Sequence, residues 1–168
     1  MGIRYYAYAF ENDQAEAALA NPRAFIGGDP LADAWGFEPY ARVATVTFEQ
    51  AVPEEQMLYL DKAWRGLQTL TGPGSAAEPA RPAFRMFEGA VTMTGWGWEP
   101  WVRAVMPEEV VEIARDLEAL TDREAVAYFV DSGMDGDGCE YPVSYLRAAR
   151  TFVSGLAARG CGMAYMIG

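Results

Sequence analysis

The chain has 168 residues, of which 51% are hydrophobic, so it is long and apolar enough to bury the core of one globular domain and is not disordered. Its formal net charge of −11 disfavours binding to nucleic acids and anionic membranes, and it suits either a basic protein partner or simple solubility. The chain contains no histidine, which excludes His-dependent triads, His general bases and most transition-metal sites.

Cysteine usage and hydrophobicity indicate the compartment. The two cysteines, Cys139 and Cys161, fit reduced thiols in a cytosol, and the sequence leaves a disulfide between them open. The N-terminus lacks the basic and apolar regions of a signal peptide, and no segment approaches the ~20 apolar residues of a membrane span. We therefore expect a cytoplasmic protein that does not enter a membrane.

The first fifty residues predict two strands, with a short helix and a long loop between them. Residues 3–10 are apolar on both faces, which is typical of a strand that is covered on both sides. Asp13 and Glu16 resemble a capping box and predict the helix. Residues 23–42 are loop-like, with aromatic side chains that should fold back onto the body, and residues 42–48 are rich in β-branched residues and predict a strand.

A long amphipathic helix is predicted from Pro53 to Gly72. Pro53 followed by two glutamates is a helix-start signature, and Gly72 followed by proline is a stop signature. Large side chains recur between these ends at spacings of three and four, which predicts one buried apolar stripe. The stripe consists of Met57, Leu60, Trp64, Leu67 and Thr71.

Asp61 borders this apolar stripe, where a carboxylate needs a partner because burying an unpaired charge is costly. One interpretation is a solvent-exposed pair with Arg65, four residues later on the same helix face. The other is a polar group that faces a cleft or clamps a neighbouring loop.

The middle of the chain contains a glycine- and tryptophan-rich segment. Residues 72–82 predict an exposed loop, and residues 84–94 predict a strand that is broken by Gly89. Residues 95–103 read GWGWEPWVR, which places three tryptophans beside a cation. These four residues are Trp96, Trp98, Trp101 and Arg103. They could form the aromatic wall of a ligand site, or the indoles could pack a loop against the core.

The last third of the chain predicts helices and a closing strand. A helix with a Pro-Glu-Glu start is predicted over residues 107–120, and a shorter one over residues 123–130. A final helix follows Tyr141 and ends at Gly160, and residues 161–167 predict a buried strand.

The acidic, glycine-rich residues 131–140 raise the hypothesis of a calcium site, because calcium prefers clustered carboxylates. Their spacing does not match an EF-hand loop, so an exposed acidic turn is the favoured interpretation and no metal site is assigned.

Three segments together resemble the YfbM-like family of bacterial domains of unknown function. They are LDKAWRGLQTLTG at residues 60–72, GWGWEPWVRAVMPEEVVEIARDLEAL at residues 95–120, and Tyr141-Pro142 with the last helix and strand; the opening MGIRYYAYAF also fits. The chain departs from the family at Arg65, where many relatives would have His, and residues 23–45 and 73–82 do not align. The resemblance implies a small cytosolic α+β domain with no established reaction, and some members are suspected to work near toxin–immunity systems.

The polar and aromatic residues that the resemblance matches are Asp61, Lys62, Trp64, Arg103 and Tyr141. Asp61 and Arg103 also stand out on physical grounds, since they carry opposite charges and border predicted apolar elements. We expect these two side chains to approach each other or to flank one cleft, either as a structural clamp or as part of a binding site.

The sequence thus predicts one α+β domain spanning residues 1–168, with a mixed or antiparallel sheet that includes both terminal strands and three to four helices packed on it. The leading functional hypothesis is a non-catalytic protein that binds a basic protein partner, with an immunity-type factor as one form of it, and without cofactor, nucleic acid or membrane. The alternative is a small-ligand protein or enzyme that uses Asp61 and Arg103 beside a Trp-lined cleft. The candidate pocket residues are Asp61, Trp64, Arg65, Trp96, Trp98, Trp101, Arg103 and Tyr141.

Overall fold

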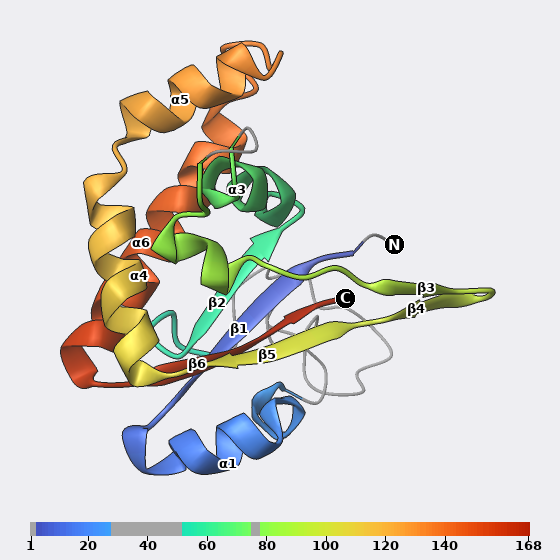
Figure 1. The fold of residues 1–168 in the computed structure, drawn as a ribbon, viewed down its shortest axis with the longest axis vertical. Helices are drawn as coiled ribbons and strands as arrows, with labels where there is room; N and C mark the ends of the chain where they lie inside the picture. Colours follow the sequence, from blue (N-terminus) through green and yellow to red (C-terminus); the bar gives the residue numbers. More distant parts are fainter. Residues whose placement is uncertain (1–2, 28–51, 75–77) are drawn as a thin grey trace.

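The computed structural model describes residues 3–27, 52–74 and 78–168, and its centre is a four-stranded antiparallel sheet (Figure 1). The strand order is β2-β1-β6-β5, so the first and last strands along the chain lie side by side in the middle. The strands are β1 (Tyr5–Phe10), β2 (Met57–Asp61), β5 (Trp101–Val105) and β6 (Gly162–Ile167). The predicted α+β class is therefore confirmed, and the sheet is antiparallel rather than mixed.

The two central strands are the ones that the sequence predicted from apolar runs, and both are buried along nearly their whole length. Between them the rings of Tyr5 and Tyr165 stack with centroids 5.3 Å apart. Both hydroxyls reach backbone carbonyls of one segment, because Tyr5 Oη donates to Met86 O at 2.8 Å and Tyr165 Oη donates to Glu88 O at 2.8 Å. Two buried phenols thus fasten residues 86–88 onto the sheet without leaving a polar group unsatisfied.

Helices cover the two faces of the sheet unequally, as Figure 1 shows. One face carries a layer in which α4 packs on α6, on η3 and on β6, while α6 packs on β2 and α3. The elements of this layer are α3 (Trp64–Thr71), η3 (Pro82–Met86), α4 (Pro107–Ala119), α5 (Asp122–Asp131) and α6 (Glu140–Arg159). The opposite face is covered by η1 (Asn12–Gln14), α1 (Ala15–Ala20) and η2 (Pro22–Phe25). The main core lies between the sheet and the larger layer.

The predicted helices of the last third are confirmed, and their ends follow local chemistry. At the start of α4, Glu109 Oε2 accepts the backbone N–H of Met106 at 2.9 Å. At the start of α5, Thr121 and Glu124 satisfy each other's backbone N–H groups. Helix α6 ends at Gly160, whose φ of +67° is left-handed and suits glycine.

The predicted helix from Pro53 to Gly72 is wrong in its first half. Residues 53–56 form a turn, Met57–Asp61 is strand β2 paired with β1, and only α3 is helical. The apolar run from Met57 to Leu60 fits either period, and pairing with β1 decides in favour of the strand. The Gly72 stop is confirmed, since α3 ends there.

Three smaller predictions need correction. The capping box lies at the start of η1 and is formed by Glu11 and Gln14, whose Oε1 accepts the N–H of Glu11 at 2.9 Å, rather than by Asp13 and Glu16. Residues 84–94 are not one strand but the end of η3 followed by strand β3 (Thr92–Thr94). The glycine- and tryptophan-rich segment is not a loop but the hairpin of β3 with β4 (Gly97–Glu99), which leads into β5. The strand predicted at 42–48 and the aromatic residues before it lie outside the described residues.

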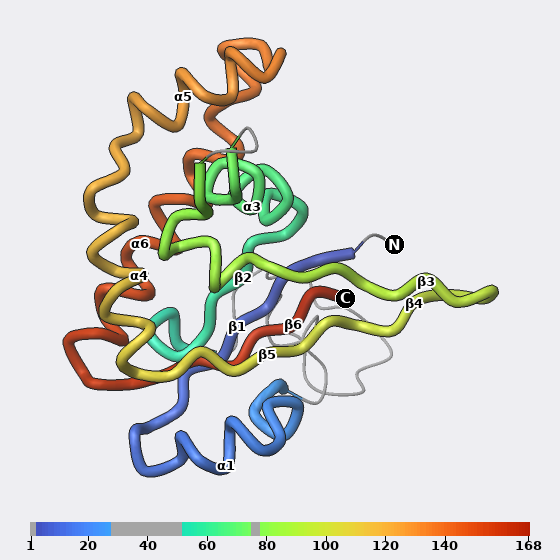
Figure 2. The backbone as a smooth tube through the Cα atoms, in the orientation of Figure 1, coloured from blue at the N-terminus to red at the C-terminus, as the bar shows by residue number. Residues whose placement is uncertain are grey.

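The β3–β4 hairpin extends away from the body of the molecule, as the tube in Figure 2 shows. Its register pairs Met93 with Trp98 directly across the two strands, so both side chains share one face. None of its residues is buried.

Candidate functional site

A cluster of polar side chains surrounds Asp61 at the end of β2. Asp61 Oδ1 accepts hydrogen bonds from Arg4 Nε and from Tyr59 Oη, both at 3.0 Å. Asp61 Oδ2 accepts one from Tyr141 Oη at 2.9 Å. The aspartate therefore clamps three parts of the chain together: the residues before β1, strand β2 and the start of α6.

The backbone at Asp61 is shaped for this role. Its φ of +44° is left-handed, which few non-glycine residues adopt, although Asp tolerates it better than most. The register of β1 against β2 shifts at the same place, since Tyr5 pairs with Asp61 while Tyr6 pairs with Tyr59. Such a bulge re-aims a side chain at the end of a strand. Here it turns the carboxylate toward Arg4 and Tyr141.

The protonation states in this cluster follow from burial and hydrogen bonding. Partial burial raises the pKa of the Asp61 carboxyl, but the hydrogen bonds from Tyr141, Tyr59 and Arg4 outweigh it and leave the pKa below its ordinary value. Burial and the hydrogen bond to Asp61 raise the pKa of Tyr141 to about 12. At neutral pH the aspartate is ionised and the tyrosine is a proton donor. Neither group is poised near pH 7, where a general acid or base works best.

Next to this cluster lies a small hollow of about 250 Å³ lined by Ile3, Lys62, Trp64 and Arg65. The guanidinium of Arg65 lies over the Trp64 ring, 5.5 Å from its centroid. Trp64 itself is buried, and its Nε1 donates to Ile3 O at 3.4 Å. Of the predicted pocket residues, the structure brings together Asp61, Trp64, Arg65 and Tyr141. The predicted Asp61–Arg65 pair is wrong, because Arg4 is the ion-pair partner of Asp61.

Arg103 lies elsewhere. It lies on β5, where its Nη1 is 2.7 Å from Glu88 Oε1 and its Nη2 is 3.2 Å from Glu109 Oε1. These two ion pairs connect the strand to the loop after η3 and to α4. Strands β2 and β5 are opposite edges of the four-stranded sheet, so three strand spacings, roughly 14 Å, separate them. The expectation that Asp61 and Arg103 approach each other or flank one cleft is therefore wrong.

None of the three tryptophans beside Arg103 is buried, and none lines the hollows of about 250 and 550 Å³ that the described residues form. Trp96, at the tip of the β3–β4 hairpin, is fully exposed; Met93 is 69%, Trp98 36% and Trp101 38% exposed. Trp101 packs against Gly89, where a Cβ atom would lie 2.4 Å from the indole. We refer to Met93, Trp96, Trp98 and Trp101 as the hairpin patch.

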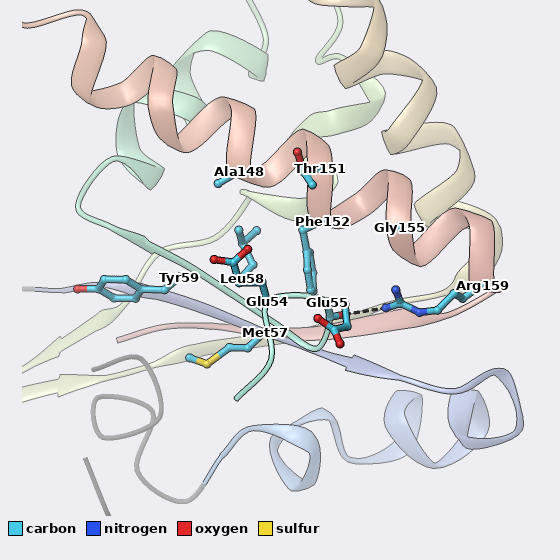
Figure 3. A pocket seen from close by; sticks show the side chains of 10 residues that line it. All are labelled: Glu54, Glu55, Met57, Leu58, Tyr59, Ala148, Thr151, Phe152, Gly155 and Arg159. Atoms are coloured by element: carbon cyan, nitrogen blue, oxygen red, sulfur yellow. Dashed lines mark hydrogen bonds between the residues drawn. The ribbon is translucent and has the colours of Figure 1, made fainter. Parts of the chain in front are cut away.

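A second, larger hollow has no counterpart among the predictions from the sequence: it is a cleft of about 550 Å³ between β2 and α6 (Figure 3). Apolar side chains of Leu58 and Phe152 form its floor, and Glu54 and Glu55 come from the turn before β2. The one available signal was the spacing of small residues along α6. Glu54 and Glu55 follow Pro53, and this pattern instead predicts the first turn of a helix.

Cys139 and Cys161 are both buried free thiols. In residues 3–27, 52–74 and 78–168, no group of three or more carboxylates and thiols is arranged to hold a metal ion. No helix in the same part of the chain is long and apolar enough to cross a membrane.

Comparison with solved structures adds one relative. The fold matches the crystal structure of YfbM from Escherichia coli, a protein of unknown function, with a TM-score of 0.53 over 99% of this chain and 100% of that chain. The chain has a YfbM-like fold. The resemblance that the sequence segments predicted is thereby confirmed at the level of the fold. Since the two sequences are 18% identical, the similarity says nothing about activity.

No family model matches the chain, and no curated protein is similar to it in sequence.

Proposed function

We propose that this protein is a non-catalytic binding protein that recognises a basic protein partner through the hairpin patch. The observation that carries the proposal is the exposure of Met93, Trp96 and Trp98 on a hairpin with no buried residue. Tryptophan is the residue most enriched where protein interfaces concentrate their binding energy. A hairpin that extends into solvent gains little stability from such side chains, so contact with another molecule is the better account of them.

Charge favours a basic partner. The chain carries a net charge of −11, and Glu99 lies on β4 beside Trp98. Arginine and lysine side chains can stack on the exposed indoles while the acidic surface attracts them over a longer range. A protein that binds and blocks a basic partner in this way would be an immunity-type factor. It would work in the bacterial cytoplasm, whose reducing conditions keep two buried cysteines as free thiols.

The polar cluster supports the second hypothesis, an enzyme, less well. Both oxygens of the Asp61 carboxylate are occupied by side chains of the protein itself. Arg103, which the sequence predicted to lie near Asp61, forms ion pairs with two glutamates at the opposite edge of the sheet. The cluster is thus better suited to clamping the fold than to proton transfer.

The test is a capture experiment followed by a titration. Wild type, the double variant Trp96→Ala/Trp98→Ala and the control Leu19→Ala, which removes an exposed side chain from α1, are each used as bait in cell lysate. Proteins retained by wild type and control are identified, purified and titrated individually. We expect one with an excess of Lys and Arg, whose affinity falls by about 30-fold or more in the hairpin variant, as for hot-spot residues.

Rising salt should weaken the same complex, because screening reduces the attraction between the exposed charges. The proposal fails if every purified protein binds the hairpin variant as tightly as it binds wild type. It also fails for a basic partner if the hairpin-dependent protein is acidic or its affinity is indifferent to salt.

A further inference from the structure

The cleft between β2 and α6 has the dimensions and shape of a small-molecule site. Its volume of about 550 Å³ falls in the range of roughly 300–1,000 Å³ in which proteins bind ligands. Leu58 and Phe152 are buried and give it an apolar floor, while the exposed face of α6 forms one wall. Figure 3 shows the Phe152 ring descending from α6 toward β2, with the side chains of Glu54 and Glu55 from the opposite wall.

Gly155 is what keeps the cleft open on the α6 side. It lies in the interior of a 20-residue helix, where glycine is less favourable than alanine. Its φ is not positive, and a Cβ atom there would meet nothing closer than Arg159 Nη1 at 3.5 Å, so neither conformation nor close packing requires glycine. Thr151 and Ala148 continue the same narrow wall one and two turns earlier. The space that a larger residue would fill is the cleft itself.

The charges at the cleft are set for a cation. Among the described residues, neither Glu54 nor Glu55 forms an ion pair, and both side chains are exposed to solvent. Arg159, the basic residue of the lining, lies at the same cleft, where its Nη2 donates to the backbone carbonyl of Glu55 at 2.6 Å (Figure 3). Two glutamates against one arginine leave the lining with a net formal charge of −1. Two unpaired carboxylates above an aromatic floor attract an ammonium group and accommodate its apolar body.

We propose that this cleft binds a small organic cation with an apolar body, of the arylalkylammonium class. The ammonium group contacts Glu54 and Glu55, and the ring or chain lies on Leu58 and Phe152 in the space left by Gly155. This site is separate from the hairpin patch, which lies on the β3–β4 hairpin and the first residue of β5, so either can be present without the other.

The probe is 2-phenylethylammonium, with phenylacetate as a matched anion and 2-phenylethanol as a matched neutral compound. Each is titrated into the ¹⁵N-labelled protein while backbone amide shifts are followed by NMR. We expect the cation to shift the amides of Leu58, Thr151 and Gly155 in a saturable manner. Its Kd should be about tenfold or more below that of the anion, because a charge-assisted contact distinguishes the two.

Two variants locate the site. Gly155→Leu fills the cleft and should abolish the saturable shifts, with circular dichroism and a thermal melt showing that α6 still forms. Glu54→Gln/Glu55→Gln changes exposed side chains only, so it keeps the test intact even if the first variant folds poorly. It should weaken binding of the cation about tenfold and leave 2-phenylethanol unaffected. Equal affinity for cation and anion, or unchanged cation binding in both variants, would overturn the proposal.

Discussion

Replacing Gly155 by alanine should stabilise the protein, which is an unusual expectation for a substitution in a packed helix. The residue lies four positions before the last residue of α6, Arg159, in ordinary helical conformation. The added methyl group would meet Arg159 Nη1 at 3.5 Å, an ordinary van der Waals distance from the flexible end of a side chain. No steric cost therefore opposes the gain in helix propensity.

The magnitude follows from the backbone alone. Glycine in a helix interior is less favourable than alanine by roughly 0.5–1 kcal/mol. For a chain of this size a change of 1 kcal/mol shifts Tm by about 2–4 °C, so Gly155→Ala should raise Tm by roughly 1–4 °C. Urea unfolding followed by circular dichroism should show a higher midpoint with an unchanged slope.

Gly162→Ala is the matched control, because Gly162 is a glycine whose missing side chain is required. A Cβ atom there would lie 2.3 Å from Phe10 Cζ and 2.8 Å from Val105 O, so overpacking should cost roughly 1–3 kcal/mol or more. If Gly155→Ala lowers the urea midpoint as Gly162→Ala does, the reasoning that Gly155 serves the cleft rather than the fold is refuted.

Three further outcomes are expected from the clamp, a helix cap and the hairpin's base. Because the pKa of Asp61 is depressed in the folded state, the ionised carboxylate stabilises the protein above pH ~4, and this stabilisation is lost as the pH falls through the folded pKa. Asp61→Asn should therefore show a flatter decline of Tm in acid than wild type. An identical decline would contradict the clamp. Thr121→Ala removes the cap of α5 and should lower the free energy of unfolding by ~1 kcal/mol in urea, whereas no change would mean that the cap is not formed in solution. Gly89→Ala should cost more than about 2 kcal/mol in the same assay, since φ is +114° and the Trp101 indole occupies the Cβ position; a neutral result would show that the indole does not rest there.

The elements that sequence reasoning placed well are those whose signals do not depend on distant partners. Helix α4 begins at a proline followed by glutamates, and α6 ends at a left-handed glycine, so neighbouring residues in the sequence determine both helix ends. Strand β6 is an uninterrupted apolar run, which suits its place in the middle of the sheet. The prediction for the residues of β2 was wrong because Pro53 and the two glutamates after it have the pattern of a helix start. The strand is determined by its pairing with β1, which the sequence of this segment does not show.

The candidate site was partly predictable for the same reason. Asp61 stood out because a charge beside an apolar run needs a partner, and the structure supplies partners. Their identity could not be deduced, since Arg4 and Tyr141 lie 57 and 80 residues away along the chain. Arg103 is also a charge beside an apolar run, and its partners are Glu88 and Glu109. Each residue was therefore correctly expected to have a partner of opposite charge, but the two are not partners of each other.

The position of β6 between β1 and β5 has a consequence for synthesis on the ribosome. Tyr5 pairs with Ile167, so β1 leaves the ribosome about 160 residues before its neighbour exists. At the usual 5–20 residues per second this interval lasts on the order of ten seconds. Throughout that time an apolar strand has one edge unpaired, a state that invites association with other chains. The pairing that later secures the centre of the sheet therefore makes the nascent chain dependent on rapid completion or on chaperones.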